Sequence, residues 1–343
     1  KTHTMQGPVT AVQSMRSDQR RGIMCRMFEY LFSEVARRHA ESNSVQYTCK
    51  CSYLEIYKEQ IADLLEPTST NLQVREDVNR GVYVERLSEH SVWTVEDAFH
   101  VLRKGLHQRH VGATQMNDFS SRSHSVFTLA LEATSTTAGG VTATRVARLN
   151  LIDLAGSERQ SFDPHNPTMH NSVQVKESGA INKSLSALTN VIMSLSSAGQ
   201  RRRSVSSGAG TARAIAAAGA GTENAVGSVG AADGRRRPFV RYRDSKLTFL
   251  LRDSLGGNSK TVIVACISPS ALCFGETLST LKFAARAKRI QCAAVMNEEY
   301  SGTVESLRLE VKSLKQQLEL LGSKGLLPAA AAGASPAPPA PGE

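Results

Sequence analysis

The residues of this chain best suited to phosphate chemistry follow an apolar run, Val146–Leu154, whose penultimate residue is an acid. Asp153 is that acid, and Gly156 and Glu158 come after it in the sequence Asp-Leu-Ala-Gly-Ser-Glu. An acid at the end of a buried strand is where phosphate-transfer folds hold magnesium through water, and a following glycine can offer its N–H to a terminal phosphate. By itself the pattern is weak, because a strand that ends in Asp and then Gly is often only a turn.

A second polar segment, Asn-Asp-Phe-Ser-Ser-Arg-Ser-His, precedes another strand-like run. Its consecutive hydroxyls, Ser120 and Ser121, can reach metal and phosphate oxygens, and Arg122 can pair with a carboxylate. Read alone, the segment is better explained as a polar loop with an N-cap. At the amino end, Lys1 and Thr2 precede a helical stretch and match the last two residues of a Walker A loop, although two residues are not distinctive.

Sequence periodicity predicts the elements that must position these residues. Apolar residues recur at helical spacing in the predicted helices, and Thr94 with Asp97 supplies an N-cap and an acid three residues later. In the predicted strands, residues either alternate between apolar and polar or are continuously apolar. The run 146–154 is apolar enough for an interior strand of a covered sheet. Strands separated by helices predict a layered α/β domain. The predicted helices are 22–35, 95–106 and 180–195, and the predicted strands are 48–57, 125–133, 146–154 and 261–267.

Composition narrows the class of protein. The 343 residues allow two or three domains, and a hydrophobic content of 41% is enough for a sizeable core. Lys and Arg number 41 against 31 for Asp and Glu, so the formal charge is +10 and an acidic partner is expected. No apolar run approaches the ~20 residues that span a bilayer, and no apolar signal region indicates secretion. Six cysteines without a Cys-x-x-Cys pair are expected to be reduced thiols rather than a zinc site.

Two changes of composition mark segments outside the layered domain. Residues 201–237 are rich in Gly, Ala and Ser, and seven Arg against two acids give 7 − 2 = +5, so a disordered basic loop is predicted. Apolar residues from Val304 to Leu321 alternate spacings of 3 and 4, which predicts either a short coiled coil or a single helix packed on the domain. After that helix, the proline-containing tail 322–343 is predicted to be disordered.

Five motifs occur in one order along the chain and together resemble the kinesin motor domain, from Lys1 to about Asn297. The resemblance implies an α/β fold of the P-loop NTPase type, a three-layer sandwich with a mostly parallel central sheet, incomplete at its N-terminus and followed by a neck helix. It also implies a microtubule motor that hydrolyses ATP with magnesium, most similar to the plus-end-directed spindle and phragmoplast class. The motifs are SSRSH at Ser120–His124, DLAGSE at Asp153–Glu158, INKSLSAL at Ile181–Leu188, YRDSKLT at Tyr242–Thr248 and LGGN at Leu255–Asn258.

The resemblance implies which residues contact the nucleotide. Lys1 would lie on the β- and γ-phosphates, and Gly156 would sense the γ-phosphate through its N–H. Asn117 and Ser120 would belong to the first switch segment, with Ser120 near the γ-phosphate. Because phosphoryl transfer needs little covalent help, these residues would mostly position groups and neutralise charge.

The resemblance also implies a magnesium site and a closing ion pair. Thr2 and Ser121 would be magnesium ligands, and Asp153 would hold the ion through water. Arg122 would pair with Glu158 when the two switches close around the attacking water. The resemblance therefore implies that residues 122 and 158 lie on the same side of the molecule.

The same resemblance to kinesin motor domains implies a microtubule-binding surface. The helix over 180–195 would lie on the microtubule, and the loop over 242–248 would adjoin it on tubulin. The contact residues implied by the resemblance are Lys183, Tyr242, Arg243 and Lys246. The basic loop falls on this side of the domain, and we expect its arginines to bind acidic tubulin tails, although a merely solvated expansion is the simpler alternative. These arginines are Arg201, Arg202, Arg203, Arg235, Arg236 and Arg237.

The expected domains are a motor domain over 1–288, a neck linker over 289–300 and a neck helix over 301–321 that joins two copies into a homodimer. The opening strands of the family and the Gly-rich part of its Walker A loop are not among these residues. We therefore expect the chain alone to bind ATP weakly or not at all and to fold incompletely. The loop after Glu158 is longer than usual in the family, which puts the coupling of filament to nucleotide in doubt.

Other classes of nucleotide-binding protein fit the sequence less well. A GTPase would need a carboxylate after Asn182 and Lys183 that the sequence lacks, and a myosin should lack the YRDSKLT segment. A microtubule-binding protein without ATPase activity remains the alternative from a different class. Nucleic-acid binding is the weakest reading, since the basic loop has no aromatic residue to stack on bases. The expected location is the cytoplasm, on microtubules, with no membrane partner.

Overall fold

The computed structural model describes residues 1–8, 19–41, 44–78, 81–114, 122–137, 140–157, 182–197 and 239–323. They form two compact units. The first comprises Lys1–Tyr30, Lys50–Leu129 and Leu149–Val295, and the second comprises Leu31–Cys49, Ala130–Arg148 and Met296–Glu343. The basic loop over 201–237 lies outside the described residues, as does most of the tail.

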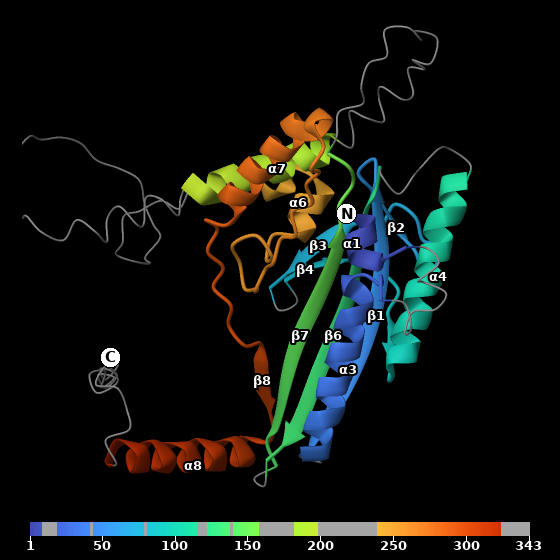
Figure 1. Ribbon diagram of the computed structural model, residues 1–343. Helices are drawn as coiled ribbons and strands as arrows, with labels where there is room; N and C mark the ends of the chain where they lie inside the picture. The colour runs from blue at the N-terminus through green and yellow to red at the C-terminus, as the bar shows by residue number, and fades with distance from the viewer. Residues whose placement is uncertain are drawn as a thin grey trace, which may run out of the picture. The chain divides into compact units, whose positions relative to one another are not determined.

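A central sheet has the strand order β2-β1-β6-β7-β8, with β5 also paired to β1 (Figure 1). The connection between β6 and β7 is too short for a crossover, so these two strands form a hairpin. Every ladder whose register is described is antiparallel, namely β1 with β2, β3 with β4, and β7 with β8. The parallel character expected of the sheet is therefore not confirmed. The strands are β1 (Val45–Tyr57), β2 (Gln60–Asp63), β3 (Val74–Asp77), β4 (Gly81–Val84), β5 (His90–Val92), β6 (His124–Thr136), β7 (Thr142–Asp153) and β8 (Glu298–Ser301).

Helices cover both faces of the sheet, which gives the expected layered α/β arrangement. On one face, the ring of Phe28 in α3 (Ile23–Glu41) contacts Phe99 in α4 (Val95–Thr114) and Phe127 in β6, with ring centroids 6.0 and 5.1 Å apart. On the other face, alternate strand residues such as Leu54 and Val126 pack with the helix over 182–197, α6 (Lys246–Leu250) and α7 (Phe274–Ala287). The alternation follows from the strand period of two.

Most predicted elements are confirmed. The strands over 48–57, 125–133 and 146–154 correspond to β1, β6 and β7, and the helices over 22–35 and 95–106 to α3 and α4. The predicted start of α4 is a reciprocal cap, because Thr94 Oγ1 accepts from the Asp97 amide at 3.2 Å and Asp97 Oδ2 accepts from the Thr94 amide at 2.9 Å. The helix predicted over 180–195 is described over 182–197. The heptad segment forms α8 (Val304–Ser323), so residues 322 and 323 extend the helix rather than begin the tail.

Two strand predictions need correction. Residues 261–267 form no strand, and Val262 is 88% exposed. A continuously apolar strand is stable only where neighbours pair with it and helices cover it, and among the described residues none pairs with this run. The covering of β7 is also partial: Arg145–Arg148 is exposed, and within the predicted run 146–154 only Leu151 and Asp153 are buried. The remaining short elements are α1 (Thr2–Gln6) and the 3-10 turns Tyr242–Asp244 and Ala271–Cys273.

Candidate functional site

The start of β6 and the end of β7 lie at one edge of the sheet, because the two strands form a hairpin. His124 is the first residue of β6 and Asp153 the last of β7. The first turn of α1 reaches the same edge, where the Thr2 hydroxyl donates to Asp153 Oδ2 at 2.7 Å. Residues that are far apart in the sequence, and were predicted separately, therefore meet at this point.

Asp153 and Thr2 have the chemistry of a magnesium site. Asp153 is 1% exposed, and its second oxygen, Oδ1, is buried without a hydrogen-bond partner among the residues that the structure describes. A buried carboxylate oxygen left in this way needs a partner, and hydroxyl and carboxylate oxygens are what Mg²⁺ prefers. The residues present thus fit the ion that the resemblance implied. Within the described part of the chain, no group of three or more His, Cys, Asp or Glu side chains offers another metal site.

Lys1 lies beside the residues that follow Asp153. Its ammonium donates to the carbonyl of Ala155 at 3.0 Å and to Ser157 Oγ at 3.5 Å, on either side of Gly156. A cation next to the backbone of a strand end is suited to bind a phosphate group there. The predicted phosphate lysine and the predicted phosphate-sensing glycine are thus neighbours in space.

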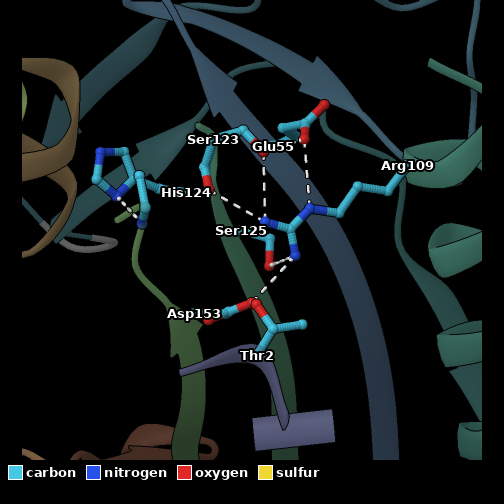
Figure 2. Close-up of polar contacts among 8 residues, drawn as sticks. Thr2, Glu55, Arg109, Ser123, His124, Ser125 and Asp153 are labelled. Atoms are coloured by element: carbon cyan, nitrogen blue, oxygen red, sulfur yellow. Dashed lines mark hydrogen bonds and ion pairs between the residues drawn. The ribbon is translucent and has the colours of Figure 1, made fainter. Parts of the chain in front are cut away.

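Arg109, which the sequence reasoning missed, is the centre of a buried polar network (Figure 2). It comes from α4 and is 4% exposed. Its guanidinium donates to Asp153 Oδ2 at 3.2 Å, to Ser125 Oγ at 3.1 Å and to the carbonyl of Ser123 at 3.0 Å. It also pairs with Glu55 of β1 at 3.4 Å. Because Asp153 Oδ2 accepts from both Thr2 and Arg109, the orientation of this carboxylate is fixed.

Glu55 closes the network on the side of β1. Burial raises the pKa of this carboxyl, whereas the Ser123 hydroxyl that donates to it and the Arg109 guanidinium lower it. A buried ion pair of this kind contributes little net stability, but removing one partner is costly because it strands the other charge. The network therefore serves the geometry of the Asp153 end more than the stability of the fold.

His124 faces away from Arg109, toward the opposite layer (Figure 2). Because neighbouring strand residues point to opposite faces, Ser123 and Ser125 reach Arg109 while His124 reaches the helix over 182–197. Its Nε2 lies 2.8 Å from Ser184 Oγ, and its Nδ1 accepts from the Ala155 amide at 3.0 Å. Burial, helped by the positive charges of Lys1 and Arg109, lowers the pKa of His124 to about 4, so the ring is neutral at pH 7.

Comparison with known proteins identifies the family that uses this arrangement. A family model described as the kinesin motor domain matches residues 1–290. The chain belongs to the kinesin family.

Similar kinesins come from animals and plants. The chain is 46% identical over 329 residues to the kinesin-like protein KIF15 of Strongylocentrotus purpuratus, and 47% identical over 323 residues to the kinesin-like protein KIN-12C of Arabidopsis thaliana. These matches cover 96% and 94% of the chain but only 20% and 14% of the relatives, so the chain spans a fifth of their length or less.

Solved kinesin structures have the same fold. A fast kinesin is similar with a TM-score of 0.65 and 36% identity, over 87% of this chain and 69% of that chain. A dimeric KIF14 in complex with a microtubule is similar with a TM-score of 0.64 and 36% identity, over 86% and 69%. The resemblance to kinesins and the expected P-loop NTPase-like fold class are thereby confirmed, apart from the parallel character of the sheet.

Part of the predicted kinesin switch lies outside the described residues. Asn117, Ser120, Ser121 and Glu158 are in this part. Arg122 is described and half-buried just before β6, so it starts at the correct edge of the sheet, but its expected pairing with residue 158 stays a prediction. The six arginines predicted in the basic loop also lie outside the described residues.

The residues predicted to contact the microtubule differ in their exposure and in whether their polar groups bond to backbone carbonyls. Lys183 is exposed on the first turn of the helix over 182–197. Arg243 is exposed as well, although its guanidinium donates to Glu76 at 3.0 Å. By contrast, the hydroxyl of Tyr242 donates to the carbonyl of Leu255 at 2.8 Å, and the ammonium of Lys246 donates to the carbonyl of Leu72 at 3.2 Å. Lys183 and Arg243 are therefore the better candidates for contact with a partner.

None of the helices among the described residues has the length and apolar character needed to cross a membrane.

Proposed function

We propose that the intact kinesin that contains these residues hydrolyses ATP and couples the reaction to movement along microtubules. The observation that supports this most directly is the meeting of Lys1, Thr2 and Asp153 at one sheet edge beside Gly156. Family membership supports the same reaction, because kinesin relatives and solved kinesins match nearly the whole chain. The activity, substrate and partners of the intact protein follow from this as proposals.

In the proposed site each residue acts through position and charge. Lys1 binds phosphate oxygens, and the Gly156 N–H approaches the terminal phosphate. Thr2 and Ser121 would be the magnesium ligands, and Asp153 would hold the ion through water. When bound, the ion neutralises charge on the phosphates. Arg109 keeps Asp153 Oδ2 engaged, which leaves Oδ1 for the hydration shell of the ion.

We propose that the partner surface for the microtubule includes Lys183 and Arg243. Both side chains are exposed cations of the first unit, and the net charge of +10 suits an acidic partner. A solved relative, KIF14, is in complex with a microtubule. The arginines of the basic loop complete this proposal as a tether to acidic tubulin tails.

The neck is proposed from the second unit. There β8 pairs antiparallel with β7, and Arg145 donates to Glu298 at 2.6 Å across the ladder. The side-chain amide of Asn297 (Nδ2) also donates to the carbonyl of Val146 at 3.3 Å. We propose that 289–300 is a neck linker in its docked form, that α8 dimerises, and that the protein acts on spindle or phragmoplast microtubules.

The variant Asp153→Asn tests the nucleotide site. It keeps the shape of the side chain and an oxygen that accepts from Thr2, but it removes the charge that magnesium needs. In the intact protein we expect ATP turnover to fall about 10- to 100-fold, with more magnesium needed for half-maximal nucleotide binding. Asp253→Asn is the matched control, because Asp253 pairs with Arg252 away from this edge. Equal turnover in Asp153→Asn and the unchanged protein would reject the site, and filament binding without any turnover would favour the non-catalytic alternative.

A further inference from the structure

A buried histidine connects the two functional regions of the first unit. The connection begins at Ala155, whose carbonyl accepts from the Lys1 ammonium at 3.0 Å and whose amide donates to His124 Nδ1 at 3.0 Å. It ends at Ser184, whose Oγ lies 2.8 Å from His124 Nε2. We call the contacts of His124 with the Ala155 amide and the Ser184 hydroxyl the His124 link.

The geometry fixes the protonation of the imidazole. A backbone N–H can only donate, so Nδ1 must be the unprotonated nitrogen. In the neutral ring the proton is then on Nε2, which donates to Ser184 Oγ. Both contacts have ordinary hydrogen-bond lengths. His124 and Ser184 are 2% and 3% exposed, and Ala155 is fully buried, so water does not compete for either contact.

The link joins elements that the chain itself connects only through a long segment. Ala155 follows β7 and lies next to Gly156, whereas Ser184 is in the first turn of the helix over 182–197, beside the exposed Lys183. The imidazole bridges them directly from the start of β6. A displacement of the backbone at Ala155 must therefore either move the imidazole or break a buried hydrogen bond. If the imidazole moves, its contact with Ser184 passes the displacement to the first turn of this helix.

We propose that His124 is a positioning residue that couples the backbone at Ala155 to the helix over 182–197. This inference rests on the proposed function for its consequence, because that helix carries Lys183 and Ala155 contacts the proposed phosphate lysine. A phosphate group bound at Lys1 competes with the Ala155 carbonyl for hydrogen bonds from the same ammonium. The link then transmits the resulting shift to the surface proposed for the filament.

The variant Ser184→Ala tests the His124 link while leaving His124 and every residue of the proposed nucleotide site unsubstituted. It removes the acceptor of Nε2–H, so the ring loses one of the two contacts that fix its orientation. Ser196→Ala is the matched control, because Ser196 is also buried in this helix, and its hydroxyl donates to the Met193 carbonyl within its own turn at 3.0 Å.

The first readout is hydrogen exchange of the Ala155 amide, which does not depend on catalysis. We expect Ser184→Ala to speed this exchange about fivefold or more, and Ser196→Ala to leave it unchanged. A merely structural loss of a buried hydroxyl would affect both variants alike. Unchanged exchange in Ser184→Ala, or equal acceleration in both variants, would overturn the proposal.

The second readout separates this inference from the proposed function. Filament affinity of the intact protein is compared with ADP and with a non-hydrolysable ATP analogue. If the unchanged protein shows no difference between the two, the proposed function fails, and hydrogen exchange still decides the link. If it shows a difference, we expect Ser184→Ala to reduce that ratio about fivefold without changing nucleotide affinity. A ratio retained in Ser184→Ala would contradict the coupling while leaving the motor function intact.

Discussion

At the scale of single residues, the buried polar groups form two separate sets of contacts, one on each face of the sheet. Arg109 gathers Glu55, Ser123 and Asp153 on one face of the sheet, and His124 joins Ala155 to Ser184 on the other. His124 and Ser125, the first two residues of β6, contribute to opposite sides because side chains alternate along a strand. A one-residue shift in the pairing of β6 would therefore exchange the two sets of contacts.

Protonation of His124 gives a prediction for stability. Its pKa is lowered to about 4 in the folded protein, chiefly by burial, whereas an unfolded histidine has a pKa of about 6.5. Between these pH values the unfolded state binds a proton that the folded state does not. Stability from this residue is thus complete above about pH 6.5 and is lost as pH falls toward 4, by on the order of 3 kcal/mol.

Urea unfolding of the unchanged protein and of His124→Gln between pH 7 and pH 4 checks this prediction. The variant lacks the titrating group, so its free energy of unfolding should fall less steeply with decreasing pH. Other groups titrate in both proteins and cancel in the difference. Parallel pH dependences for the two proteins would show that His124 is not buried as a neutral ring.

At the scale of secondary structure, α4 packs closely on β1 at one glycine. A methyl group added at Gly105 would lie 2.1 Å from Cδ1 of Tyr53, a side chain that is fully buried. Alanine is the better helix former by about 1 kcal/mol, so helix propensity alone would favour Gly105→Ala. Overpacking against a buried ring outweighs this gain, and we expect the variant to lose about 1–3 kcal/mol of unfolding free energy.

Gly275→Ala in α7 is the control for this prediction. No atom lies within 4 Å of a methyl group added there, so the substitution should be neutral or slightly stabilising. Thermal unfolding of both variants measures the difference. If Gly105→Ala unfolded at the same temperature as Gly275→Ala, then α4 would not pack on Tyr53 as described.

The apolar stripe of α8 gives a second prediction at this scale. Leu314 and Leu318 belong to the heptad pattern and are 48% and 54% exposed, whereas Leu309 is 62% exposed but lies off the stripe. If the stripe forms the dimer, Leu314→Glu should halve the mass measured by sedimentation equilibrium, and Leu309→Glu should not. A monomeric unchanged protein at micromolar concentration would refute dimerisation through α8.

Local patterns predicted the elements whose stability is mostly local. The alternation of β1 and β6 and the Thr94–Asp97 cap are short-range features, and the structure contains them. The strand predicted over 261–267 failed because a buried strand depends on neighbours that periodicity does not reveal. Arg109 was missed for a related reason. A charged residue on an amphipathic helix usually faces solvent, and only Glu55, Ser123 and Asp153, which come from other elements, make its burial possible.

The site itself was predicted from motifs rather than from periodicity. Lys1, Thr2, Asp153 and Gly156 are each weak signals alone, yet the fold brings them to one sheet edge. The order of the five motifs along the chain carried the family assignment, which the match over residues 1–290 confirms. The pairing of Arg122 with Glu158 stays a prediction, because residue 158 lies outside the described part of the chain.

At the scale of the whole molecule, the proposed ATP site and the proposed filament-binding surface lie in one compact unit. The nucleotide residues converge at the edge of β6 and β7, and the exposed Lys183 lies on the helix that His124 contacts through Ser184. The excess of positive charge favours association with an acidic polymer and makes that association sensitive to salt. Reaction and binding should therefore influence each other.

The most direct test is the rate of ATP hydrolysis by the intact protein as microtubule concentration is raised at low salt. The account predicts turnover that rises with microtubules to a plateau and that is largely lost in Asp153→Asn. A protein that sediments with microtubules but hydrolyses ATP at the same rate with and without them would contradict the account.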